Sequence, residues 1–144
     1  MGDRVSEPAT ETATTVGIRV PAVLEQLLML RALAETVALI ADFAVDEVTD
    51  IRLALDEVAT ALILDAVPGS TIACDFSYDD RQMFVHVSSM ATSQDVVEKQ
   101  SFGWHIVRTL TASLSAMQAP FDEIIGGYPT VVDFSWVRGE TNGG

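Results

Sequence analysis

The sequence DEVTDIRLALDEVATALILD, residues 46–65, predicts a long amphipathic helix that organises the rest of the chain. Its apolar residues recur at steps of three and four and form one core face: Val48, Ile51, Leu55, Val58 and Leu62. Its carboxylates crowd the remaining surface: Asp46, Glu47, Asp50, Asp56 and Glu57. Asp46 is the expected N-cap, and Pro68-Gly69 closes the segment.

Two alternating segments follow this helix. Thr71–Ser77 and Gln82–Ser88 are joined by Tyr78-Asp79-Asp80-Arg81, which predicts a β-hairpin. Before the helix, Thr14–Val20 is rich in β-formers and predicts a first strand, which Pro21 ends.

Another helix is expected from Ala22 to Asp42. Its core stripe comprises Leu27, Leu30, Ala34, Val37 and Ala41. Four apolar residues lie off that stripe: Leu28, Met29, Leu39 and Ile40. A helix that is apolar on more than one side has a second surface to bury. Either this helix is sandwiched inside the domain, or it contacts another molecule.

The last third of the sequence predicts a polar loop, a helix and a second hairpin. Residues 91–100 form the loop, and Ser101 is the expected N-cap of a helix that reaches about Met117. Its stripe comprises Trp104, Val107, Leu110, Leu114 and Met117. The hairpin pairs Phe121–Ile125 with Thr130–Val137.

The resulting order is strand, helix, helix, strand, strand, helix, strand, strand. It favours an α+β two-layer sandwich, with the helices on one face of a mainly antiparallel sheet. The 144 residues suit one domain. We place it at residues 14–138, with flexible tails at 1–13 and 139–144.

The charge of the chain limits its partners. Eight Lys and Arg residues stand against 21 Asp and Glu residues, a formal net charge of −13. This balance argues against binding to nucleic acid or to an anionic membrane surface, and it favours a basic protein partner. The longest apolar stretch, residues 27–45, is interrupted by Arg31, Glu35 and Asp42, and no secretory signal is recognisable. A cytoplasmic protein is therefore expected.

Several kinds of chemistry are not expected. Cys74 is the single cysteine, so it can form no internal disulfide, and a buried strand thiol is the expected role. His86 and His105 have no second metal ligand at a recognisable spacing, so ordinary histidines and no metal site are expected. The sequence also lacks a nucleophile elbow, a Walker A motif and a dinucleotide fingerprint.

Two segments carry a resemblance to a known family. They are DIRLALDEVATALI at residues 50–63 and SFGWHIV at residues 101–107. The first resembles the N-box helix of RsbW-type anti-sigma factors, which are bacterial serine kinases with a histidine-kinase-like ATPase fold. The second resembles their glycine box, and its S-F-x-W-H form is especially similar to the mycobacterial anti-sigma-F branch. The resemblance extends over about residues 14–138.

The resemblance implies a function. Family members hold a sigma factor away from RNA polymerase, and an anti-anti-sigma protein releases it. Typical members bind Mg-ATP and phosphorylate a serine of that antagonist. Members are commonly dimers, so a homodimer is expected. Sigma factors use basic surfaces for promoter DNA, which agrees with an acidic antagonist.

This chain departs from the family in its nucleotide motifs. Glu57 occupies the general-base position, but Ala61 replaces the Asn that binds Mg²⁺, and a methyl group cannot do so. Gly103 and Thr130 match the family pattern. The other departures are Ser89 for the adenine-binding Asp, and Ala91, Ser93 and Ser101 for glycines. Weak or absent ATP and Mg²⁺ binding is expected, so whether the chain is an enzyme stays open.

The resemblance places Arg31 where family members contact the sigma factor. Glu25, Leu28 and Glu35 lie near it on the same predicted helix and are the further candidates for this partner surface. The alternative role for Arg31 is an ion pair with Glu35 on the same helix. Two other functions stay open: an active serine kinase that uses Glu57, Gly103 and Thr130, and a small-ligand sensor that reuses the altered pocket.

Overall fold

The computed structural model describes residues 13–94 and 102–139. The elements follow one another in the predicted order. They are β1 (Thr14–Pro21), a 3-10 turn η2 (Leu24–Gln26), α2 (Leu27–Ile40), α3 (Val45–Leu64), β2 (Thr71–Tyr78), β3 (Gln82–Ala91), α4 (Phe102–Leu110), β4 (Ser113–Gln118) and β5 (Tyr128–Val137). The predicted tails lie outside the described residues, apart from Ala13 and Gly139.

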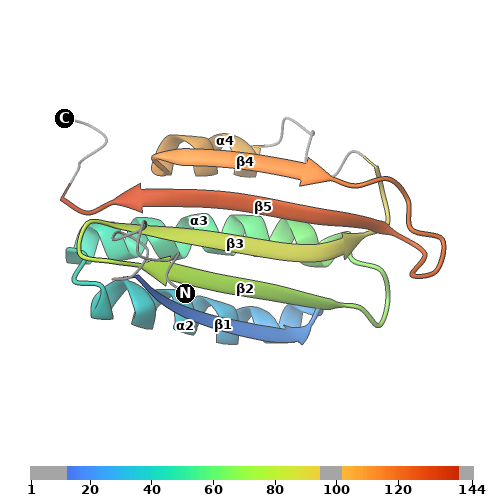
Figure 1. The fold of residues 1–144 in the computed structure, drawn as a ribbon, viewed down its shortest axis with the longest axis horizontal. Coiled ribbons are helices and arrows are strands. Elements are labelled where there is room, and N and C mark those ends of the chain that lie inside the picture. The colour runs from blue at the N-terminus through green and yellow to red at the C-terminus, as the bar shows by residue number, and fades with distance from the viewer. Residues whose placement is uncertain (1–12, 95–101, 140–144) are drawn as a thin grey trace, which may run out of the picture.

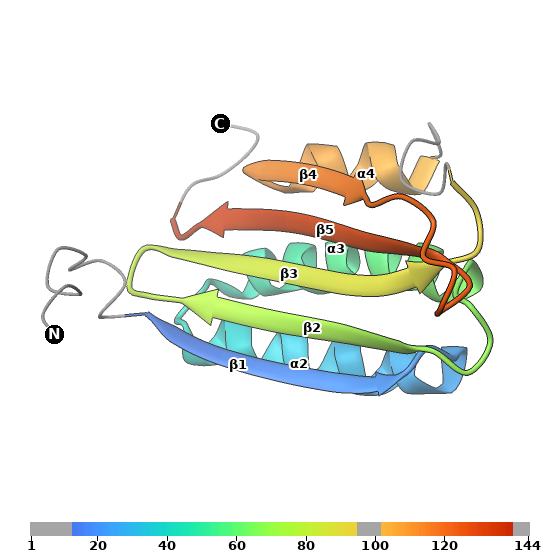
Figure 2. The ribbon, with the colours of Figure 1, turned by 45° about the vertical axis from the view of Figure 1, so that its right-hand side comes forward.

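The described strands form one sheet in the order β1-β2-β3-β5-β4, and every neighbouring pair is antiparallel. The three helices lie on one face of this sheet, and the other face is open (Figures 1 and 2). The predicted α+β two-layer sandwich is therefore confirmed.

The core lies between the two layers. Strand residues that point toward the helices alternate with residues that point to the open face, as a half-buried sheet requires. Phe76, Val85 and Phe134 are buried on the helix side of three neighbouring strands. The predicted helix stripes meet them, because Leu30 and Val37 of α2 and every predicted stripe residue of α3 are buried.

The start of α3 corrects one expectation. The helix begins at Val45, and its N-cap is Ala44 rather than Asp46. The carboxylate of Glu47 accepts a hydrogen bond from the backbone N–H of Ala44 at 2.8 Å. Glu47, in the first turn of the helix, therefore provides the acceptor for the backbone N–H of the N-cap residue, which the N-cap side chain itself does not satisfy.

The third helix is shorter than expected. It ends at Leu110, and the segment SLSAMQ that follows is strand β4. The indole N–H of Trp136 donates to the carbonyl of Leu110 at 2.8 Å, which satisfies the end of the helix. Leu114 faces the core from β4, whereas Met117 points to the open face. The proposed N-cap, Ser101, lies outside the described residues.

The predicted strand Phe121–Ile125 is wrong, because this segment is a turn. β4, and not this segment, pairs with β5. The carboxylate of Asp122 accepts hydrogen bonds from the backbone N–H groups of Ile124 and Ile125, at 3.0 and 3.2 Å. These local bonds compete with strand pairing, as Asp side chains commonly do in turns.

Candidate functional site

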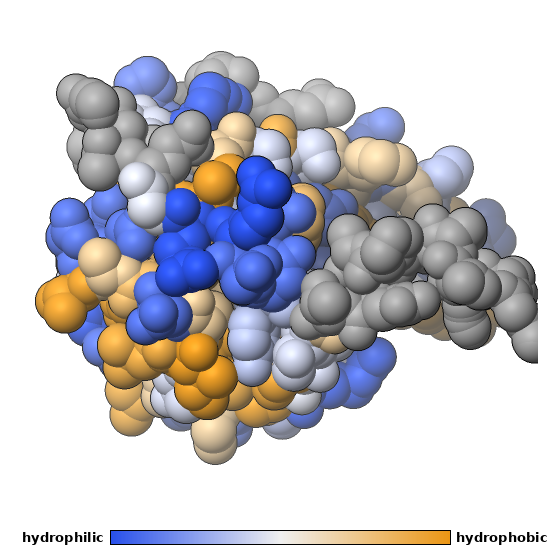
Figure 3. All heavy atoms as spheres, turned by 60° about the vertical axis from the view of Figure 1, so that its left-hand side comes forward, coloured by the Kyte–Doolittle hydropathy of each residue, from blue (hydrophilic) through white to orange (hydrophobic). Residues whose placement is uncertain are grey.

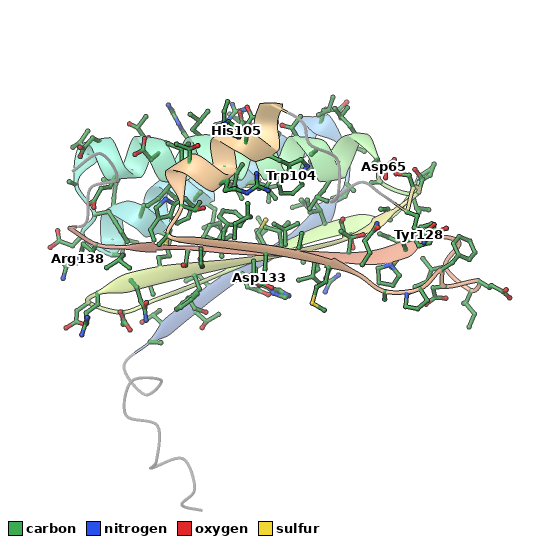
Figure 4. The ribbon with its side chains drawn as sticks, turned by 90° about the horizontal axis from the view of Figure 1, so that it is seen from above. Asp65, Trp104, His105, Tyr128, Asp133 and Arg138 are labelled. Atoms are coloured by element: carbon green, nitrogen blue, oxygen red, sulfur yellow. The ribbon has the colours of Figure 1, made fainter. Side chains whose placement is uncertain are left out.

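A small pocket lies between α3 and α4. It has a volume of about 200 Å³ and is lined by Glu57, Thr60, Ala61, Gly103, Trp104 and Val107. Three of the four residues predicted for the nucleotide site therefore meet here. Trp104 is buried and points toward the sheet, whereas His105 points away from it (Figure 4).

The fourth predicted residue, Thr130, is buried on β5 in a separate polar cluster. Its hydroxyl donates to the carbonyl of Tyr128 at 2.9 Å and accepts from the Gln118 amide at 3.0 Å. Ser89 is paired with Thr130 in the sheet and is only 8% exposed. The Ser89 hydroxyl and the Gln118 amide oxygen have no hydrogen-bond partner among the described residues. Gln118 was not predicted, because its segment resembled a helix.

Asp65 joins the end of α3 to the segment after β3. Its carboxylate accepts hydrogen bonds from the Thr92 hydroxyl at 2.7 Å and from the Ser93 hydroxyl at 2.7 Å. The backbone N–H of Ser93 also donates to it, at 3.1 Å. This role of Asp65 was not predicted, although an acidic residue at a helix C-terminus interacts unfavourably with the helix dipole and therefore indicates a specific partner. Figure 4 shows Asp65 and Tyr128 at the same end of the molecule.

The pocket between α3 and α4 is small for a nucleotide. Pockets for small ligands typically have volumes of about 300–1,000 Å³, which exceeds the volume between α3 and α4. Glu57 and Thr60 supply the polar side chains there, and the described lining residues include no Lys or Arg to face phosphate oxygens. Ala61 offers a methyl group where the metal ligand should be. Within residues 13–94 and 102–139, no group of three or more His, Cys, Asp or Glu could hold a metal ion.

Arg31 bridges the two long helices. Its guanidinium donates to the carboxylate of Asp56 on α3 at 2.7 Å, and its side chain is 35% exposed. The alternative pair with Glu35 is therefore wrong, because α3 lies close enough to offer a better partner. Glu25 and Leu28 are exposed on the same layer, and Glu35 is half-buried.

The helix layer is acidic and partly apolar. Residues 24–65 carry nine carboxylates and two arginines, a net charge of −7. The four apolar residues off the stripe of α2 are exposed, with Leu28 at 68%. The idea that α2 is sandwiched inside the domain is therefore wrong. Figure 3, which brings the left-hand side of Figure 1 forward, shows a hydrophobic group at the lower left beside hydrophilic residues.

The open face of the sheet carries a cross-strand row of polar residues. Asp75, His86 and Asp133 are neighbours in register on three strands. His86 Nδ1 lies 2.6 Å from the carboxylate of Asp133, and Asp133 points away from the helices (Figure 4). Both side chains are exposed, as is His105. These positions agree with ordinary surface histidines.

No helix in the described part of the chain is long and apolar enough to cross a membrane.

Comparison with known proteins confirms the resemblance drawn from two short segments. No protein-family model matches the chain. The chain is 37% identical over 95 residues to the anti-sigma-F factor RsbW of Mycobacterium tuberculosis, in strain CDC 1551 / Oshkosh and in strain ATCC 25618 / H37Rv. The match covers 66% of this chain and 56% of each relative, so the chain spans a little more than half the length of the curated relatives.

Proposed function

We propose that this chain is an RsbW-type anti-sigma factor that acts in the cytoplasm. It sequesters an alternative sigma factor from RNA polymerase, and an anti-anti-sigma protein relieves it. The observation that carries this proposal is the 37% identity to the anti-sigma-F factor RsbW over two thirds of the chain. We further propose that the working form is a homodimer.

The helix layer supports a sigma factor as the partner. The net charge of −7 on residues 24–65 complements the basic surfaces that a sigma factor offers to promoter DNA. Its exposed apolar residues, including Leu28 and Leu39 of α2, supply area that can be buried on binding. The acidic groups can pair with the cations of a basic amphipathic partner, and the apolar groups can pack against its apolar side.

Sequestration without phosphoryl transfer is the simpler mechanism for this chain. Phosphoryl transfer depends on positioning and on metal-assisted neutralisation of charge. Ala61 gives no metal ligand, and the pocket beside Glu57 is small. Relief by the antagonist then rests on competition for the sigma-binding surface. We expect no phosphorylated antagonist when the two proteins are incubated with saturating Mg-ATP, and its detection by mass spectrometry would favour the kinase function.

The proposal is tested by capture of a sigma factor from lysate of the native cell. Tagged wild-type chain should retain a sigma factor that mass spectrometry identifies. Leu28→Asp should lose most of it, because a charge would replace an exposed apolar side chain on the helix layer. Phe84→Asp is the matched control, since Phe84 is an exposed apolar residue on the open face.

Two results would contradict the proposal. If wild-type chain retains no sigma factor, with or without Mg-ATP, the similarity reports the fold alone. If Phe84→Asp loses the sigma factor and Leu28→Asp retains it, the helix layer is not the binding surface. Circular dichroism of both variants confirms that each is folded.

A further inference from the structure

The open face of the sheet is hollowed at one end. A groove of about 480 Å³ lies there, at the end of the sheet that carries the turn between β4 and β5 (Figure 2). Gly69, Ser70 and Ser88 are small and leave the space, whereas Met90 and Val131 form an apolar side. The volume lies in the range of about 300–1,000 Å³ that is typical of small-molecule pockets.

The charge of this groove is opposite to that of the whole chain. Its described lining residues include Arg19 and no Asp or Glu, although the chain has 21 acidic residues and a net charge of −13. The pocket between α3 and α4 contains Glu57, and the hollow beside Arg138 contains three aspartates. The groove is therefore a locally positive site on an acidic protein, which favours an anion.

The guanidinium of Arg19 has hydrogen-bond donors to spare. It donates to the neutral hydroxyl of Thr71 at 3.3 Å, which is a long contact. Within residues 13–94 and 102–139, Arg19 forms no ion pair with a carboxylate, whereas Arg31 bonds to Asp56 at 2.7 Å. Because Arg19 is also exposed, its planar guanidinium can bind an incoming carboxylate through two N–H groups.

The surroundings of the groove limit the size of its ligand. Toward the centre of the sheet, His86 lies two residues before Ser88 on β3, with Asp75 and Asp133 beside it in register. These two carboxylates would repel an acidic polypeptide that ran along the open face. On another side, Ile125 of the turn between β4 and β5 forms part of the wall. A small anion fits this enclosure better than an acidic protein segment does.

We propose that the groove binds a small organic carboxylate with an apolar body. The carboxylate accepts hydrogen bonds from Arg19, and the hydroxyls of Thr71 and Ser88 line the same groove as further donors. The apolar body packs against Met90 and Val131. The site goes beyond the anti-sigma function and does not depend on it, because the groove lies on the face opposite the helix layer.

Two probes that differ in charge test the site. Octanoate and octylammonium have alkyl chains of nearly the same length, and each is titrated into the purified chain at pH 7.5 and followed by ¹H–¹⁵N NMR. Octanoate should bind at least about tenfold more tightly, with shifts centred on Arg19, Ser88 and Val131. Non-specific attraction to a chain of net charge −13 would favour octylammonium instead.

Substitutions at Arg19 make the test specific. Arg19→Gln should weaken octanoate binding about tenfold, because one charge-assisted hydrogen bond is lost. Arg19→Glu should reverse the preference, so that octylammonium binds more tightly than octanoate in the groove. Arg52→Gln is the matched control, since it removes an arginine from α3 and should leave octanoate binding unchanged. Circular dichroism confirms that each variant is folded.

Three results would overturn the proposal. The first is octanoate binding that is no tighter than octylammonium binding in the wild type. The second is a set of octanoate-induced shifts that lies on the helix layer. The third is an equal effect of Arg19→Gln and Arg52→Gln, since this would mean that the overall charge, and not the groove, determines binding.

Discussion

The guanidinium of Arg31 has two roles: it forms an ion pair with Asp56 in the fold, and it is the predicted contact with the sigma factor. Arg31→Gln and Asp56→Asn both remove the ion pair between α2 and α3, and each should lower stability by less than about 1 kcal/mol because the pair is partly exposed. We expect Arg31→Gln to weaken sigma binding about tenfold, the cost of one lost charge-assisted contact. Asp56→Asn releases the guanidinium and should leave the affinity equal or higher.

Isothermal titration calorimetry of the two variants distinguishes these roles. Equal losses of affinity in both variants would mean that Arg31 acts by holding the helices together. A loss confined to Arg31→Gln would place its guanidinium at the partner.

Cys74 illustrates a residue whose role follows from its surroundings. It is fully buried in β2, and burial, with a smaller contribution from Asp75, raises the pKa of its thiol to about 12. The thiolate is the reactive form. We therefore expect Cys74 to resist iodoacetamide at pH 8 in the native protein and to react within minutes in denaturant, as intact-mass spectrometry would report. Rapid labelling of the native chain would contradict the burial.

Among the elements, the connection from β4 to β5 depends on a glycine. A Cβ at Gly127 would lie 2.8 Å from the carbonyl oxygen of Ala91 and 2.5 Å from Val67. The backbone oxygen cannot move aside easily, so Gly127→Ala should destabilise the protein by about 1–3 kcal/mol, as overpacking typically does. Urea unfolding at one fixed protein concentration measures this change.

Ala119→Ser is the control for that variant. Ala119 is exposed on the same connection, so its replacement should shift stability by less than about 0.5 kcal/mol. An unchanged midpoint for Gly127→Ala would mean that the connection can move away from β3.

The helices and strands also show which parts of the fold can be predicted from sequence patterns. The α3 segment and the β2–β3 hairpin were predicted well, because their apolar periods are unambiguous over many residues. Leu110 and Leu114 fit both a helical step and an alternating strand, so the period alone could not place the end of α4. The turn at Ile124 was missed because Asp122 bonds to the backbone, a contact that apolar spacing does not encode.

The candidate site was predicted only in part for a similar reason. Glu57 and Ala61 lie one helical turn apart, so one motif located both. Thr130 and Ser89 were named from the resemblance and are paired between β3 and β5, whereas Gln118 was missed because its pairing with Thr130 depends on where β4 begins.

Over the whole molecule, charge is segregated between layers. Residues 24–65, which include α2 and α3, hold about half of the net charge of −13, whereas the open face carries Arg19 and a histidine between two aspartates. We expect the association rate with a basic sigma factor to fall at least about tenfold between 50 and 500 mM NaCl. The reason is that salt screens the attraction between the acidic chain and its basic partner. Stopped-flow fluorescence measures this rate. A rate that does not depend on salt would assign recognition to the apolar residues alone.

Both ends of the described chain emerge beside the same hairpin. Thr14 is paired with Tyr78 and Val137 with Gln82, so β1 begins and β5 ends next to the β2–β3 turn. The turn at Ile124 lies at the far end of β5, ten residues or about 30 Å away (Figure 1). A fluorescent reporter or a sensor-chip anchor attached at either end of the described chain would therefore lie far from that turn.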